Sequence, residues 1–218
     1  MNDIHTSESS VKDYFTDVYN EEASLNNIPW VTGAVGIEIL KKVIGKKFPL
    51  ASNVLDVGCG FGTEAVFLAR HGHHVIGVDT DATIIGKAKE YAKLLDTFVD
   101  FRVCNFLKTV EQSELFSRFD IVIDQGCFHH ILPQDRQAYK NAVVHCLKNG
   151  GKYLMRGFSN LMPPSTSGNG PVRLTSDDIL NTFLSDFYVD EMYVFDNIPV
   201  VGKEDMPQKF WFVSLTKR

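Results

Sequence analysis

The sequence predicts one α/β domain built on a doubly wound, mostly parallel sheet, in three layers with helices on both faces. The 218 residues are 44% hydrophobic, which suits a single domain with a sizeable core. The middle of the chain alternates β-branched runs with amphipathic segments, and such runs are typical of parallel strands buried on both faces. Five strand–helix units in succession imply the doubly wound parallel sheet. Near the C-terminus, two runs joined by a turn-rich connection predict an antiparallel hairpin strand at the sheet edge.

The expected elements follow one another along the chain. The parallel strands are expected at residues 53–57, 74–79, 98–104, 119–124 and 152–158, and the hairpin strands at 187–195 and 209–215. Helices are expected at 11–22, 36–47, 63–71, 81–95, 110–116 and 133–147, with a last one beginning at Thr175. We expect Asn149-Gly150-Gly151 to cap the helix that ends at Leu147. The chain therefore divides into an N-terminal helical lid (1–48), a core (51–158) and a C-terminal loop, helix and hairpin (159–218).

The composition limits which classes of partner, and which cellular compartment, we expect for this protein. A formal net charge of −5 gives no field that would gather nucleic acid or an anionic membrane. The N-terminus lacks the pattern of a signal peptide, and no apolar run approaches the ~20 residues that span a bilayer. The cysteines are Cys59, Cys104, Cys127 and Cys146. They have neither the paired spacing of a zinc site nor the density of a disulfide scaffold. We expect a cytoplasmic protein with reduced thiols and no metal.

The central motif is a glycine-rich turn, DVGCGFG, from Asp56 to Gly62. It directly follows a predicted strand and precedes a predicted helix, the context in which a glycine motif indicates a nucleotide-type ligand. Glycine has no Cβ, so the chain bends sharply and a ligand can lie against bare backbone, with N–H groups at the helix start facing it.

Two features favour S-adenosylmethionine (SAM) over a dinucleotide. A carboxylate two residues before the first glycine, Asp56, would repel a pyrophosphate, whereas SAM presents an ammonium and a sulfonium beside its carboxylate. The spacing is also G-x-G-x-G and not G-x-G-x-x-G. We expect Asp56 to orient the cationic end of SAM, while the backbone of Gly58, Cys59, Gly60 and Gly62 approaches the ligand.

The ends of the next two strands supply candidates for the nucleoside. Asp79, followed by Thr80, ends the second strand and is placed to accept both ribose hydroxyls; the alternative is a helix N-cap. After the third strand, Asn105 is expected to meet the adenine amino group and Phe106 to pack on the ring.

These motifs together resemble the class I SAM-dependent methyltransferases, which have a Rossmann-like fold. The matches cover residues 53–158 and include the glycine motif, Val75 to Asp79, Asn105-Phe106, Ile123-Asp124 and Asn149-Gly150-Gly151. More narrowly, the chain resembles the thiopurine methyltransferase-like branch, which includes thiol and halide methyltransferases. The segments that carry this closer likeness are Asn27 to Trp30, Asp124 to Phe128 and Leu132 to Arg136.

The resemblance implies roles for further residues. Trp30 would line the SAM pocket, although it could equally anchor the N-terminal helix. Asp124, followed by Gln125, would begin the loop beneath the transferring methyl group. Asn105 stands where the family usually has an acid, so a charged contact with adenine would be weakened. The expected product is S-adenosylhomocysteine (SAH).

The expected reaction is an in-line displacement that needs alignment and exclusion of water, without a metal. A thiolate or halide acceptor needs no base; a neutral hydroxyl or amine would need one, for which His129 and His130 are the nearby candidates beside Asp124. The alternative for the histidines is capping or packing. Arg136 and Arg156 could bind an anionic acceptor or simply solvate a surface.

The most favoured interpretation is a methyltransferase acting on a small molecule, a thiol or similar soft nucleophile. The N-terminal helix and the loop at 163–171 are expected to cover the acceptor. A methyltransferase of proteins or other macromolecules, a non-catalytic SAM-binding module and a nicotinamide dehydrogenase stay open as alternatives. The sequence leaves the oligomeric state open between monomer and homodimer.

Overall fold

The computed structural model describes residues 34–111, 113–162, 172–196 and 208–218. The predicted helix at 11–22, Trp30 and the loop at 163–171 lie outside these ranges, so the expectations placed on them stay predictions. Within these ranges, no helix is both long and apolar enough to cross a membrane.

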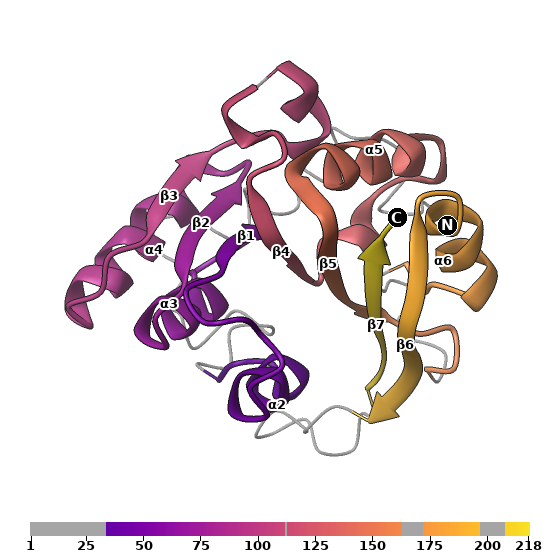
Figure 1. Cartoon of the computed structure of the whole chain (residues 1–218), viewed down its shortest axis with the longest axis horizontal. Coiled ribbons are helices and arrows are strands. Elements are labelled where there is room, and N and C mark those ends of the chain that lie inside the picture. The colour runs from indigo at the N-terminus through magenta and orange to yellow at the C-terminus, as the bar shows by residue number, and fades with distance from the viewer. Residues whose placement is uncertain (1–33, 112, 163–171, 197–207) are drawn as a thin grey trace, which may run out of the picture.

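A seven-stranded sheet forms the centre of the molecule, in the order β3-β2-β1-β4-β5-β7-β6 (Figure 1). The strands are β1 (Asn53–Val57), β2 (His74–Asp79), β3 (Asp100–Val103), β4 (Phe119–Gln125), β5 (Leu147–Phe158), β6 (Phe187–Asp196) and β7 (Lys209–Lys217). β1 to β5 pair in parallel, whereas β7 pairs antiparallel with both β5 and β6. The expected mostly parallel sheet with an antiparallel C-terminal hairpin is confirmed.

Helices cover both faces of the sheet, as two separate buried clusters show. One cluster joins α3 (Thr63–Arg70), α4 (Ala82–Leu94) and α2 (Ile37–Ile44) to one side of the strands. The other joins α5 (Arg136–Cys146) and α6 (Ser176–Phe183) to the opposite side. In Figure 1, α3 and α4 accordingly lie apart from α5 and α6. The three predicted layers are therefore present.

Local signals in the sequence set the helix starts. The Asp81 side chain accepts hydrogen bonds from the N–H groups of Thr83 and Ile84, at 2.8 and 3.0 Å, and so begins α4. Thr175 and Asp178 form a reciprocal capping box at the start of α6. Both arrangements satisfy N–H groups that the first helical turn cannot pair.

Two local predictions were wrong. Asn149, Gly150 and Gly151 do not cap α5, which ends at Cys146; they lie inside β5, whose register with β4 shifts between the Phe119 and Ile121 pairings. The chain passes from helix to strand without a loop, and Gly150, at φ +72°, accommodates the irregularity. The helix expected at 110–116 is instead two 3₁₀ turns, Phe106–Glu111 and Ser113–Leu115. Short 3₁₀ turns of this kind commonly connect longer elements.

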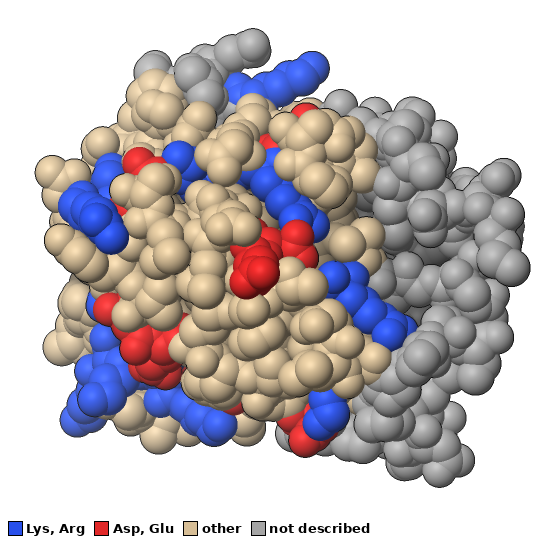
Figure 2. Space-filling model, turned by 90° about the vertical axis from the view of Figure 1, so that its right-hand side faces the viewer, with Lys and Arg blue, Asp and Glu red and all other residues tan. Residues whose placement is uncertain are grey.

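Charges of both signs are interspersed on the face that Figure 2 shows. Neither the basic nor the acidic side chains form a continuous stripe on its described part. This agrees with the small net charge and offers no support for a nucleic-acid surface there.

Candidate functional site

The sequence candidates meet at the carboxyl ends of β1, β2 and β4. β1 lies between β2 and β4, so the chain reverses its winding direction at the β1–β4 pair. Ligands of open α/β sheets bind in the crevice outside such a switch point. The turn after β1, the end of β2 and the loop after β4 all border this crevice.

The glycine turn is held by hydrogen bonds within the protein. The N–H groups of Gly58 and Cys59 donate to the Val78 carbonyl at 2.9 and 3.0 Å, and that of Gly62 donates to the Cys59 carbonyl at 2.8 Å. The Gly60 N–H donates to Asp79 Oδ2 at 3.0 Å. The sequence predicted N–H groups facing a ligand, but these four are already bonded. A pyrophosphate needs such donors, so this arrangement disfavours a dinucleotide and suits a ligand with a cationic end.

The three glycines of the turn all have positive φ, yet their surroundings differ. A Cβ added at Gly62 would lie 2.4 Å from the Phe101 ring, and one at Gly58 would lie 3.0 Å from the Cys127 Cβ. At Gly60, no heavy atom of the described residues lies within 4 Å. Gly58 and Gly62 are therefore required by packing, whereas Gly60 exposes bare backbone on which a ligand can lie.

Asp79 lies beside this open position. Its Oδ2 accepts from the Gly60 N–H and its Oδ1 from the Asp81 N–H at 3.2 Å. Burial raises the pKa of this carboxyl, and the hydrogen bonds from Gly60, Asp81 and Thr80 oppose that shift. Each oxygen keeps a lone pair for a further donor, so Asp79 fits a pair of ribose hydroxyls. Thr80 follows at an exposed position.

Asp56 is only 2% exposed, beneath the turn. Burial raises its pKa well above the ordinary value, and the negative charges of Glu64, Asp124 and Asp79 raise it further. A cation bound near this cluster would relieve the repulsion, as the positive end of SAM would. The sequence prediction missed Glu64, whose Oε1 accepts from the Gly36 N–H at 3.1 Å. Its signal is an acid in the first turn after the glycine motif.

Asp124 is enclosed at the end of β4. Its carboxylate accepts from three backbone N–H groups of the following loop: Gly126 at 3.1 Å, Cys127 at 2.6 Å and Phe128 at 2.9 Å. It also accepts from the hydroxyls of Tyr139 at 2.6 Å and Tyr153 at 3.0 Å. The side chain is 0% exposed, and burial raises its pKa. This geometry disagrees with a catalytic contact, because the carboxylate holds the loop and is shielded from a substrate.

The loop after β4 carries the histidine pair. His129 is 3% exposed, and its ring centroid lies 4.1 Å from that of His130 and 4.8 Å from that of Phe158. His130 is only partly buried. Gln125, the last residue of β4, donates from Nε2 to the Asp124 carbonyl at 3.4 Å. The structure thus brings Gln125 and both histidines to the edge of the crevice.

The candidates after β3 only partly match their predicted roles. The Asn105 Oδ1 accepts from the Leu107 N–H at 3.0 Å, which closes a local turn. The Phe106 ring is 6% exposed and packs edge-on against Tyr139, with centroids 5.2 Å apart. The ring packs in the core, and its packing on adenine stays a prediction. Cys59 is likewise buried, at 7% exposed, so only its backbone faces the turn.

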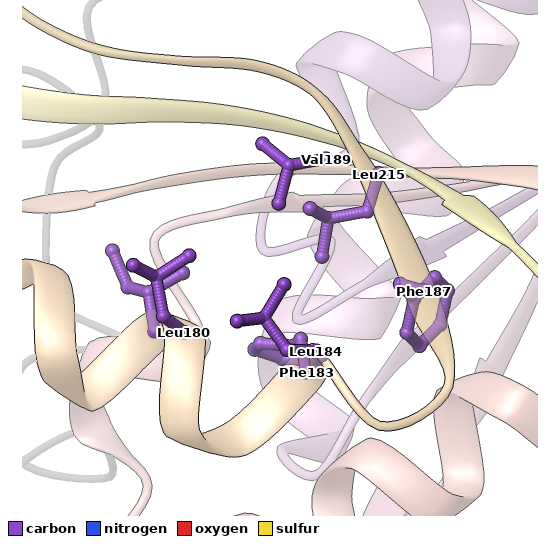
Figure 3. A pocket seen from close by; sticks show the side chains of 7 residues that line it. Leu180, Phe183, Leu184, Phe187, Val189 and Leu215 are labelled. Carbon is purple, nitrogen blue, oxygen red and sulfur yellow. The ribbon is translucent and has the colours of Figure 1, made fainter.

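A small apolar hollow lies elsewhere, between α6 and the strands β6 and β7 (Figure 3). Its lining consists of apolar side chains: Ile179, Leu180, Phe183, Leu184, Phe187, Val189 and Leu215. It offers no polar group to orient a ligand and is a gap in packing rather than a candidate site.

Comparison with known proteins gives the same interpretation. Residues 54–151 match the sequence model of a methyltransferase domain. The chain is 32% identical over 168 residues to the 2-heptyl-1-hydroxyquinolin-4(1H)-one methyltransferase of Mycobacteroides abscessus, covering 75% of this chain and 72% of that protein.

Solved structures of similar fold include one described as conversion of a disulfide bond into a thioacetal group during echinomycin biosynthesis. It has a TM-score of 0.79 and 21% identity over 95% of this chain and 92% of that one. Another is the 1,6-didemethyltoxoflavin-N1-methyltransferase of Burkholderia thailandensis with bound S-adenosylhomocysteine, at a TM-score of 0.71 and 19% identity over 100% and 91% of the two chains. With the site and the family match together, the chain belongs to the class I SAM-dependent methyltransferases.

Proposed function

We propose that the chain transfers a methyl group from SAM to a small-molecule acceptor, a thiol or another soft nucleophile, by in-line displacement. The observation that carries this proposal is the open backbone at Gly60 beside Asp79, near the buried carboxyl group of Asp56. The relative from Mycobacteroides abscessus carries a hydroxyquinolone in its name, which supports a small organic acceptor.

Each residue of the crevice has a defined role in this proposal. Asp79, with Thr80 beside it, accepts the ribose hydroxyls, and Gly60 leaves room for the donor. Asp56 balances the cationic end of the donor. Asp124 acts as a positioning residue through the loop it holds. SAM, when bound, supplies an electrophilic methyl group on a sulfonium.

The acceptor decides whether a histidine takes part. A thiolate attacks without losing a proton, so His129 and His130 would then serve only to shape the site. A neutral hydroxyl or amine must lose one, and an imidazole is the side chain that accepts protons near neutral pH. Gln125, Asn105 and Trp30 complete the proposed donor pocket.

The first experiment measures binding of SAM and SAH by calorimetry. We expect both to bind the wild type and Asp79→Ala to weaken binding by about 10- to 100-fold, because a charged acceptor of two hydrogen bonds is lost. Asp177→Ala, which removes an exposed acid of α6, is the matched control and should bind like the wild type. Absence of SAM binding by the wild type would contradict the proposal.

The second experiment identifies the acceptor class. The enzyme with SAM is offered benzenethiol, iodide, phenol and 1-hydroxyquinolin-4(1H)-one, and methylated products are measured by mass spectrometry. We expect turnover of benzenethiol in particular. Methylation of protein alone would favour the macromolecular alternative, and SAM binding without any product would favour a non-catalytic module.

A further inference from the structure

A second charged group, Arg156, lies at the crevice on the side opposite Asp79. Arg156 is the third residue from the end of β5; it pairs with Gln125 of β4 and with Phe212 of β7. Its guanidinium carbon lies 5.1 Å from the centroid of the Phe210 ring. The side chain therefore reaches the carboxyl edge of the sheet over an aromatic surface.

Arg156 forms no ion pair within the described part of the chain. Its Nε is buried and has no hydrogen-bond partner there, and the neighbouring Gln125 Oε1 is in the same condition. A buried, unpaired donor or acceptor costs about 1 to 3 kcal/mol, and more when it is charged. The Arg156 Nε is a donor, so an acceptor atom of a bound ligand would satisfy it.

The side chains of Gln125 and Arg156 converge on Gly36. A Cβ placed on Gly36 would lie 2.7 Å from Gln125 Oε1, 3.6 Å from Arg156 Nη1 and 3.6 Å from Glu64 Oε1. Glu64 is not within ion-pair distance of Arg156, and its Oε1 already accepts from the Gly36 N–H. The negative charges of Glu64 and Asp124 act on Arg156 from a distance, while burial lowers the pKa of the guanidinium. Among the described residues, the guanidinium thus lacks a direct counter-ion.

The position along the sheet favours the acceptor over the donor. The glycine turn follows β1, and Asp79 is the last residue of β2. β5 lies on the other side of β1, two strands and about 10 Å away. In-line displacement requires the acceptor and the leaving sulfur on opposite sides of the methyl carbon. The β5 side, where the tilted rings of Phe158 and Phe210 lie 4.5 Å apart between centroids, is therefore left for the acceptor.

We propose that Arg156 binds a negatively charged group of the acceptor, so that the enzyme selects small aromatic anions. This rests on the proposed function. An ionised acceptor supplies the direct counter-ion that the described part of the chain does not. Carboxylates, aryloxides and aryl thiolates all satisfy this chemistry, since a guanidinium donates charge-assisted hydrogen bonds to each, and two parallel ones to a carboxylate.

The test compares two probes of the same shape, benzoate and benzamide. Their affinities are measured by calorimetry with and without saturating SAH, in the wild type, in Arg156→Gln and in Arg156→Lys. We expect the wild type to favour benzoate over benzamide by about tenfold, Arg156→Gln to lose this preference and Arg156→Lys to keep part of it. Arg118→Gln removes an exposed guanidinium and should behave as the wild type.

The remaining outcomes separate this inference from the proposed function. If Arg156→Gln weakened SAH binding tenfold or more while the preference for benzoate persisted, the guanidinium would serve the donor and the inference would be overturned. An equal affinity of the wild type for both probes would also overturn it. If the wild type failed to bind SAH, the proposed function would fail, and the benzoate preference measured without SAH would still decide the role of Arg156. A near-wild-type melting temperature of each variant confirms that it is folded.

Discussion

The glycine turn after β1 and the loop after β4 border the same crevice, yet they are held in opposite ways. The turn is fixed mainly by hydrogen bonds from its own N–H groups to the end of β2, and at Gly60 it leaves a face that no described side chain covers. The loop is fixed by one buried carboxylate, Asp124, which accepts from three backbone N–H groups and two tyrosine hydroxyls. The comparison teaches that the turn offers the open surface on which the proposal places the ligand, whereas the loop is supported from the core. Changes in the two regions should therefore separate binding from stability.

The largest effect is expected for Asp124→Ala. This change leaves buried donors without an acceptor, so the free energy of unfolding should fall by about 3 to 5 kcal/mol. Denaturant unfolding followed by circular dichroism measures it. Glu90→Ala, at an exposed position of α4, is the control and should change stability by less than about 0.5 kcal/mol. A drop as small as that of the control would show that the loop is held by other contacts.

Gly62→Ala should lower the free energy of unfolding by about 2 to 4 kcal/mol. The new methyl group would meet the Phe101 ring at 2.4 Å, and φ is +75°, a conformation that side chains disfavour. Chemical denaturation gives the value. Gly86→Ala is a matched control in α4 with no atom within 4 Å, and it should raise stability by about 0.5 to 1 kcal/mol. Equal losses in the two variants would contradict the packing argument.

Gly60→Ala sharpens the comparison within the turn itself. Stability should fall by only about 1 kcal/mol, since the cost is the positive φ alone. Affinity for SAM should fall at least about tenfold, because the methyl group occupies the surface proposed for the donor. Calorimetry and thermal unfolding together test both parts. Unchanged SAM affinity would place the donor elsewhere.

The smallest effect concerns pH and Asp56. Because its pKa is raised in the folded protein, protonation favours the fold; this stability contribution is complete below the ordinary carboxyl pKa and is lost as the pH rises through the raised one. Asp56→Asn should therefore be more stable than the wild type at neutral pH, with the difference vanishing in acid. Thermal unfolding at several pH values measures this difference.

Binding should depend on pH in the opposite sense. A cationic donor favours the ionised Asp56, so SAM affinity of the wild type should rise with pH through the raised pKa and then level off. In Asp56→Asn this rise should be absent. A parallel rise in both proteins would assign the titration to another carboxyl, such as Asp79.

The periodicity of apolar residues and the positions of glycine, proline and capping residues were sufficient to predict the sheet, its helices on both faces and the glycine turn. Strands buried on both faces and amphipathic helices carry patterns that depend on neighbours in the chain. The same patterns failed at Asn149 to Gly151, where a Gly-Gly pair resembles a helix cap but forms an irregularity inside β5, between the pairings of Leu147 and Lys152 with β4. Pairing of the flanking residues with a strand distant in sequence overrides a local signal.

The sequence by itself determined the expectation of a nucleotide-type ligand at the end of β1, because glycine spacing and the acid at position 79 are local features. Only the tertiary structure decided how the candidate side chains lie around that crevice. It buried Phe106 in the core, enclosed Asp124 among five donors, and brought Glu64, Gln125 and Arg156 together around Gly36. The physical reason is that the orientation and burial of a side chain depend on which strands lie side by side. The residue spacing within a single strand does not specify that strand order.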